Sequence, residues 1–319
     1  MIEAVADGEK RDLELKIVSA DDIIVNSNQH PVVPHPLQPP LSHLPPKSIT
    51  LLRSIKLSSQ PVSVCQHEGV TYVGLYNGTV IRIDSNYNLH DSFISPPGIV
   101  ESICIYENRL YILSYKSCRR VSVYEVSGQM VTTWRHPYHG YNCSMLTVAA
   151  GNVVVADPRN KRLTIYSLTG ETQRNVSCPL LSNNPVSICA GHDDDVIIAD
   201  YETQKVFKFN IITGDVMWTF TQPDPPQGLV RYGDYILVAA YNRNIIFTLS
   251  YATGEKVSEM RGDGIGKDNI DSLSVTGNTL VVPQWSENKV FFYELSEKVI
   301  ARDSNSAIIR ALYGRRMLY

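Results

Sequence analysis

Six segments of about forty residues repeat the same order of apolar and polar stretches along the chain. Each contains an apolar run, a polar turn, a second apolar run, a longer polar loop and a third run in which apolar and polar residues alternate. The first apolar residues of the third runs are Val80, Val121, Leu163, Val206, Ile246 and Val290, which are 41, 42, 43, 40 and 44 residues apart. A regular period of this length is typical of a repeat architecture.

Each repeat is long enough for four short β-strands, the content of one propeller blade. Apolar runs such as 153–156 and 196–199 suit strands that are covered on both faces. Turn glycines precede the fourth strand in four repeats, at Gly128, Gly170, Gly214 and Gly254. Residues 48–300 show no sustained helical periodicity, which excludes helical repeat arrays. We therefore predict an all-β fold, a six-bladed β-propeller over residues 48–305.

Two segments decide how the ring closes. Residues 49–57 precede the first repeat and have no partner within it, so we expect them to form the outer strand of the last blade. Residues 298–305 compete for the same place. Residues 307–319 resemble the opening of another repeat, so seven blades is the alternative to six.

The two ends of the chain differ from the repeats. Residues 1–25 combine charges with spaced apolar residues, as at the end of a helix or coiled coil through which the chain could self-associate. Residues 26–47 carry seven prolines between Pro31 and Pro46, the composition of a stiff linker. Residues 306–319 form a C-terminal extension.

Composition narrows the class of protein. Hydrophobic residues make up 43% of the chain and charged residues 19%, and the formal net charge is −3. This balance disfavours a globally basic nucleic-acid binder. The sequence has neither the ~20 continuous apolar residues of a membrane span nor the start of a secretory signal. We therefore expect a cytoplasmic protein.

Residues suited to catalysis or metal binding are sparse. The six cysteines form no C-x-x-C pair, and Cys65, Cys104 and Cys189 recur in one apolar context that predicts core positions. His136 and His139 lie close together, but the sequence suggests no third metal ligand for them. The first strands offer serines (Ser63, Ser102, Ser187 and Ser274) with little acid or histidine. We expect no catalytic residues, no metal and no cofactor.

Basic and aromatic residues concentrate in the loops between second and third strands and in the connections between blades. In a propeller these segments share one face, so the sequence predicts a partner-binding face there. Arginine and aromatic residues dominate interface energetics, and the same pair suits stacked bases and phosphates. The predicted residues are Tyr115, Lys116, Arg119, Arg120, Arg135, Tyr138, Arg159, Lys161, Arg162, Tyr201, Lys205, Tyr241, Arg243, Trp285 and Lys289.

Two repeats carry a recognisable motif. Residues 154–166 read VVADPRNKRLTIY and residues 197–209 read IIADYETQKVFKF, and only these two keep the Ala-Asp pair. The motif is similar to the NHL repeat, and the chain resembles the NHL-like propeller of the tripartite-motif (TRIM) family, invertebrate type. In that family the propeller selects the protein to be ubiquitinated or, in some members, binds RNA.

The resemblance implies a binding platform without catalytic residues. The sequence contains no RING or B-box array of Cys and His, so any ubiquitin-ligase activity would need another domain or partner. The favoured hypothesis is the substrate-recognition module of a TRIM-type E3 ubiquitin ligase system, with a protein ligand. The alternative is a propeller that binds single-stranded RNA in post-transcriptional regulation.

Overall fold

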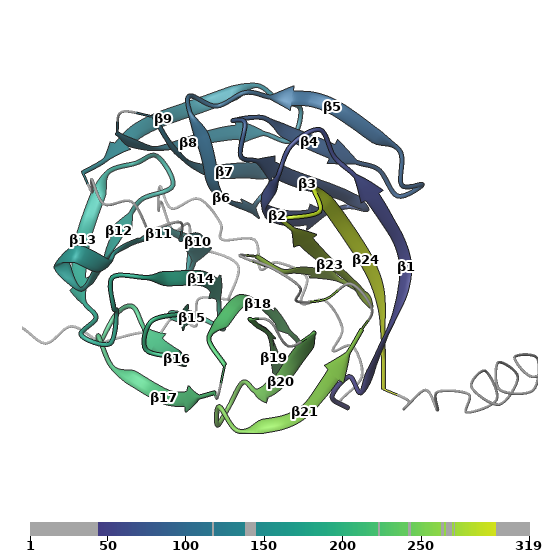
Figure 1. Ribbon diagram of the computed structural model, residues 1–319. Helices are drawn as coiled ribbons and strands as arrows, with labels where there is room; N and C mark the ends of the chain where they lie inside the picture. The colour runs from purple at the N-terminus through teal and green to yellow at the C-terminus, as the bar shows by residue number, and fades with distance from the viewer. Residues whose placement is uncertain are drawn as a thin grey trace, which may run out of the picture. The chain divides into compact units, whose positions relative to one another are not determined.

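The computed structural model describes residues 44–116, 118–137, 145–222, 224–241, 244–262, 265, 270 and 272–297. The described residues form six four-stranded antiparallel sheets arranged as blades around a central axis (Figure 1). The prediction of an all-β, six-bladed propeller is therefore confirmed. The segments 1–25, 298–305 and 306–319, and most of the proline-rich segment 26–47, lie outside the described residues. In the described part of the chain, no helix is both long enough and apolar enough to cross a membrane.

In each blade the strands follow one another from the axis outward. Blade 1 contains β2 (Pro61–His67), β3 (Val70–Leu75), β4 (Val80–Ile83) and β5 (Leu89–Ile94). Blade 2 contains β6 (Ile99–Tyr106), β7 (Arg109–Tyr115), β8 (Arg119–Glu125) and β9 (Met130–His136). Blade 3 contains β10 (Leu146–Ala149), β11 (Asn152–Asp157), β12 (Arg162–Tyr166) and β13 (Thr172–Ser177). Blade 4 contains β14 (Pro185–Ala190), β15 (Asp195–Asp200), β16 (Lys205–Asn210) and β17 (Val216–Thr221). Blade 5 contains β18 (Pro226–Tyr232), β19 (Tyr235–Ala240), β20 (Ile245–Ser250) and β21 (Lys256–Arg261).

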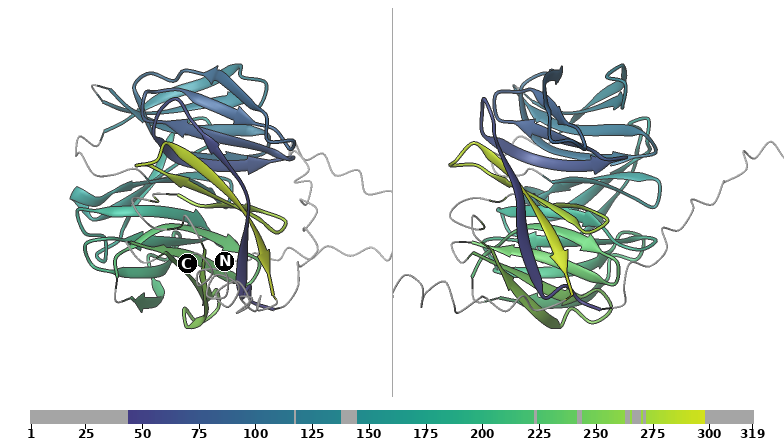
Figure 2. Two further views of the ribbon diagram at one scale, coloured as in Figure 1. Left: turned by 45° about the vertical axis from the view of Figure 1, so that its right-hand side comes forward. Right: turned by 90° about the vertical axis from the view of Figure 1, so that its right-hand side faces the viewer.

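Blade 6 is built from both ends of the described chain. Its strands are β22 (Ser274–Thr276), β23 (Thr279–Gln284), β24 (Lys289–Ser296) and β1 (Ser48–Lys56). The first strand runs antiparallel to the last, from the pair Ser48 and Ser296 to the pair Lys56 and Lys289. Figure 2 shows β1 and β24 side by side. The expectation that residues 49–57 complete the last blade is confirmed, and this pairing joins the two ends of the ring.

The core lies between the blades. The described residues form six hydrophobic clusters, one at each interface between neighbouring blades. Residues 153–156 and 196–199 are at most 1% exposed, because the second strand of a blade is covered on both faces. Successive residues of a strand point to opposite neighbours, so one blade supplies side chains to two clusters.

The turn glycines have two separate reasons to be glycine. Gly170 and Gly254 have φ angles of 98° and 74°, a left-handed backbone that disfavours residues with a Cβ. A Cβ on Gly170 would also come within 2.5 Å of the Trp134 ring, and one on Gly254 within 2.5 Å of the Trp218 ring. The outer-strand tryptophan of one blade therefore packs directly on the turn of the next.

Candidate functional site

The loops between second and third strands lie on the same face of the ring as the connections between blades. Tyr76, Tyr201 and Tyr241, each just after a second strand, donate backbone N–H bonds of 2.9–3.1 Å to the carbonyls of Gln60, Asn184 and Pro225. Each carbonyl belongs to the segment that leads into the same blade. We call this side of the ring the upper face.

An aromatic residue ends or directly follows the second strand in five of the six blades. In the sheet register, the aligned residues Val80, Val121, Leu163, Val206, Ile246 and Val290 pair with Gly74, Leu113, Ala156, Ala199, Ala239 and Pro283. Two residues further on stand Tyr76, Tyr115, Pro158, Tyr201, Tyr241 and Trp285. The five aromatic residues among these are named the aromatic collar.

Collar rings of neighbouring blades touch. The Tyr76 and Trp285 rings meet edge to face with centroids 4.8 Å apart, and the Tyr201 and Tyr241 rings do the same at 5.6 Å. Such arrangements are favourable for aromatic pairs. Tyr76 is 45% exposed and is the most open of them. The collar thus presents apolar area with little conformational freedom.

The predicted partner-binding residues separate into three groups. The most accessible are Lys116, Arg135, Arg159 and Lys161. The partly buried ones are Tyr115, Arg120, Arg162, Tyr201, Lys205, Tyr241, Trp285 and Lys289. Tyr138 and Arg243 lie outside the described residues, and Arg119 is buried.

Arg119 was expected in a surface loop, but it begins β8 and points into the interface between blades 2 and 3. It is 1% exposed, and its Nε and NH2 atoms each donate a 2.7 Å hydrogen bond to a different oxygen of Glu101. Such two-point pairing is the strongest geometry for these groups. Since Val121 and Val123 point the same way into this interface, Arg119 contributes to packing and is not on the upper face.

His136 occupies the same interface. It is 1% exposed, and its Nδ1 lies 2.7 Å from the Tyr166 hydroxyl. Burial lowers the pKa of His136 to about 4, so the ring is neutral at ordinary pH. The suggested partner His139 lies outside the described residues. Among the residues that are described, no group of three or more His, Cys, Asp or Glu could hold a metal ion.

The buried imidazole predicts an acid-sensitive interface. The pKa of His136 is about 4 in the folded chain but near 6.5 when unfolded, so only the unfolded chain binds this proton between those values. Folding stability should therefore fall as pH drops from about 6.5 to about 4. Urea unfolding of the wild type and of His136→Gln across this pH range measures the free energy of unfolding. If that free energy fell equally with pH in both proteins, the prediction would be contradicted.

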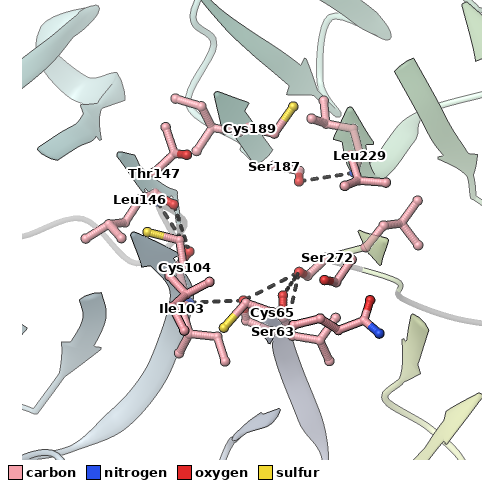
Figure 3. A pocket seen from close by; sticks show the side chains of 18 of the residues that line it. Ser63, Cys65, Ile103, Cys104, Leu146, Thr147, Ser187, Cys189, Leu229 and Ser272 are labelled. Carbon is pink, nitrogen blue, oxygen red and sulfur yellow. Dashed lines mark hydrogen bonds between the residues drawn. The ribbon is translucent and has the colours of Figure 1, made fainter. Parts of the chain in front are cut away.

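Serine hydroxyls in the central cavity join the first strands of neighbouring blades. The cavity measures about 190 Å³ (Figure 3). Ser63 accepts a 3.0 Å hydrogen bond from the Ile103 N–H, and Ser102 accepts one of 3.3 Å from Leu146. Ser187 and Ser272 likewise accept from Leu229 and Val64, at 3.2 and 3.3 Å. In blade 6 the acceptor is Ser272, which precedes β22, while Ser274 lies in β22 and also lines the cavity. These hydroxyls serve the backbone of the next blade.

The cysteines Cys65, Cys104 and Cys189 also line this cavity. Burial raises the pKa of Cys104 and Cys189 to about 12 and that of Cys65 well above its usual value, which keeps the thiols protonated. The five described cysteines are free, and the three in the cavity pack as buried or partly buried residues, as the sequence predicts.

A groove opens on the upper face between blades 1 and 2. Its volume is about 470 Å³, within the range of ligand pockets, and its walls include Pro96, Ile99, Tyr115 and Lys116. Gly78 and Gly98, with φ angles of 88° and 96°, bring three backbone segments together here. A Cβ on Gly78 would lie 2.5 Å from the Gly98 carbonyl oxygen, and one on Gly98 would collide with the Tyr115 carbonyl.

Comparisons with known proteins add little about function. No protein-family model matches the chain, and no curated protein matches it. Among solved structures, the crystal structure of the computationally designed Ika8 protein is similar, with 16% sequence identity over 73% of this chain and 70% of that one. Its TM-score is 0.48. The function must therefore be argued from the upper face itself.

Proposed function

We propose that this protein is a binding platform that takes a protein partner on its upper face and has no catalytic residues of its own. The aromatic collar carries this proposal, since five of six blades place an aromatic side chain at one equivalent position. Tyrosine and tryptophan are enriched among residues that dominate binding energy, because they bury a large area at low entropic cost. A β-propeller commonly serves as a platform for protein interactions.

Site-specific crosslinking tests the proposal. A photoreactive phenylalanine at position 76 should capture discrete proteins in a cell extract, because Tyr76 is the most exposed residue of the collar. The matched control is position 212, which is similarly exposed (47% against 45%) but lies in the turn between β16 and β17, on the opposite face. Equal crosslinking at both positions would argue against an upper-face site.

Truncation of the collar should weaken the captured complex. We expect Tyr76→Ala together with Trp285→Ala to reduce affinity at least about tenfold, since interface aromatics often contribute about 2 kcal/mol or more each. Calorimetric titration with the purified partner measures this, with Ile212→Ala as control. Unchanged affinity in the double variant would reject the collar as the site.

The finer proposal is substrate recognition in a TRIM-type ubiquitin ligase system. The Ala-Asp motif that carries the resemblance has a structural use in blade 4, which supports this proposal. Its Asp200 carboxylate accepts hydrogen bonds from the hydroxyl and N–H groups of Ser182 and Thr203, at 2.7–3.0 Å. This fixes the segments beside the collar. If the proposal holds, a RING-containing protein binds the chain in cells. Ubiquitination of the captured partner is then lost in the collar variant, which carries Tyr76→Ala and Trp285→Ala.

RNA binding is the second candidate. Lys116, Arg159 and Lys161 are exposed on blades 2 and 3, and no ion pair involves them among the described residues. Fluorescence anisotropy with a random single-stranded RNA pool at about 50 and about 150 mM salt tests it. Phosphate contacts would show as affinity that falls steeply with salt. Salt-independent or absent binding would exclude this candidate.

A further inference from the structure

The groove between blades 1 and 2 continues into a row of cationic side chains, Arg120 and Arg135 of blade 2, which we call the basic row. Ser114, at the end of β7, pairs with Arg120 of β8, which pairs in turn with Arg135 of β9. Residues paired across strands point to the same side of a sheet. The Ser114 hydroxyl donates a 2.9 Å hydrogen bond to the Pro97 carbonyl in the connection from blade 1. The two arginines therefore lie on the side of blade 2 that faces blade 1, where the groove opens.

This row has no anion to balance it within the described part of the chain. No ion pair involves Arg120, Arg135 or the groove residue Lys116 there, while Glu101 is engaged by Arg119. Arg135 is exposed and Arg120 is partly buried. Like charges directly opposite one another on neighbouring strands are destabilising. A ligand with carboxylates would relieve this repulsion and form charge-assisted hydrogen bonds with the guanidinium groups.

The groove itself suits an apolar side chain. Pro96 and Ile99 supply apolar side chains to its lining, beside the polar residues Asn77, Thr79 and Ser95. Gly98 lies directly against the Tyr115 carbonyl, which holds the segments of the two blades together. Neighbouring strands lie roughly 4.8 Å apart, so Arg135 lies roughly 10 Å outward from the strand that ends in the groove. An extended peptide covers that distance in about three residues. One short segment can thus reach both features.

A peptide fits these features better than RNA. Exposed cations of this face occur on blades 2 and 3, and the same face carries Glu202, Asp224 and Glu287 on blades 4 to 6. A phosphate backbone that continued around the ring would therefore meet carboxylates on the opposite blades.

We propose that the groove and the basic row form one binding site for an extended acidic peptide. An apolar side chain of the peptide enters the groove beside Pro96 and Ile99, and carboxylates in the next few residues contact Lys116, Arg120 and Arg135. This rests on the proposed function and names the class of partner segment. It also predicts which residues discriminate among partners.

Selection from a random dodecapeptide library displayed on phage, against the full chain, tests the site. We expect enriched peptides to share an apolar residue followed within about three positions by Asp or Glu. The variant Lys116→Gln, Arg135→Gln should bind the selected synthetic peptides at least tenfold more weakly. The control variant Arg53→Gln, Arg261→Gln removes two positive charges from outer strands β1 and β21 and should bind normally.

Stability separates a binding role from a structural one. Removing Arg135 relieves its repulsion with Arg120. The melting temperature of the row variant, which carries Lys116→Gln and Arg135→Gln, should therefore be unchanged or slightly higher. A clear drop in melting temperature would show that these cations support the fold, and would overturn the proposal.

The remaining outcomes distinguish this inference from the proposed function. Selected peptides that lack acidic residues, but still need the aromatic collar, would overturn the acidic-peptide site and leave the platform intact. Peptides that bind the collar variant and the row variant as tightly as the wild type would overturn both. Row-dependent binding of a random single-stranded RNA pool, with no peptide enriched, would reassign the row to a nucleic acid.

Discussion

Removal of residues 1–57 should abolish cooperative folding of the propeller, whereas removal of residues 1–43 should not. The longer deletion removes β1, whose backbone pairs along the whole of β24. It also removes Ile49 and Leu57, which are 9% and 5% exposed and pack in the clusters on either side of blade 6. The shorter deletion leaves every described strand in place.

The magnitudes favour complete loss of the fold. Each buried aliphatic side chain contributes roughly 1.5–3 kcal/mol, and each backbone hydrogen bond roughly 0.5–1.5 kcal/mol. A strand of nine residues therefore contributes an amount comparable to the roughly 5–15 kcal/mol of a whole domain. Its loss also leaves β24 as an open edge, which favours aggregation.

Thermal unfolding followed by circular dichroism, together with size-exclusion chromatography, measures the effect. A synthetic peptide of residues 44–58 added to the longer deletion should restore a cooperative transition, because it supplies the missing strand. A monomeric deletion that melts within a few degrees of the full chain would show that closure by β1 is dispensable.

The repeat period made the architecture predictable. Val80, Val121 and their four equivalents define a strand in every blade, so the blade number and the role of residues 49–57 followed from counting. The serines of the first strands were identified from the repeat, and Ser274 lies in β22 and lines the central cavity. Their hydrogen bonds to the next blade were not predictable, since in blade 6 the acceptor is Ser272, which precedes β22.

The upper face was less predictable because loop lengths differ. Tyr76 lies four positions before Val80, whereas Tyr115 lies six positions before Val121. Counting from the third strand therefore overlooks Tyr76, and only strand pairing shows that it belongs to the collar. The groove depends on close contact between segments of two blades, which no single repeat reveals.

Arg119 shows a different limit. It has the same parity along β8 as Val121 and Val123, which is a sequence signal for an inward-facing position. Yet an arginine at the start of a strand is ordinarily at the surface. Its burial depends on Glu101, eighteen residues earlier on another strand, and that pairing appears only once the blade is assembled.

Replacement of this arginine should be the most damaging single substitution discussed above. We expect Arg119→Met to lower the free energy of unfolding by about 3–5 kcal/mol, because it leaves the Glu101 carboxylate buried without its partner. Glu101 is only 11% exposed. The double variant Glu101→Gln, Arg119→Met should recover much of this loss, since it removes the unpaired charge.

The stability deficit of Arg119→Met should increase as pH rises. Burial raises the pKa of Glu101, and the Arg119 guanidinium opposes that rise. Without Arg119 the pKa rises further, so the folded variant keeps this proton at pH values where the unfolded chain has released it. The variant therefore loses stability as pH increases above the ordinary glutamate value of 4.5. Guanidinium unfolding at about pH 4.5 and about pH 7.5 should show the larger deficit at the higher pH.

Arg162→Met provides the matched control. Arg162 also pairs with a buried carboxylate, that of Asp157 at 2.8 Å, but its own side chain is 33% exposed. Solvent screens such a pair, so its loss should destabilise the protein less than the loss of Arg119. Equal deficits for Arg119→Met at both pH values would mean that Glu101 finds another counter-charge, and would contradict the assigned role of Arg119.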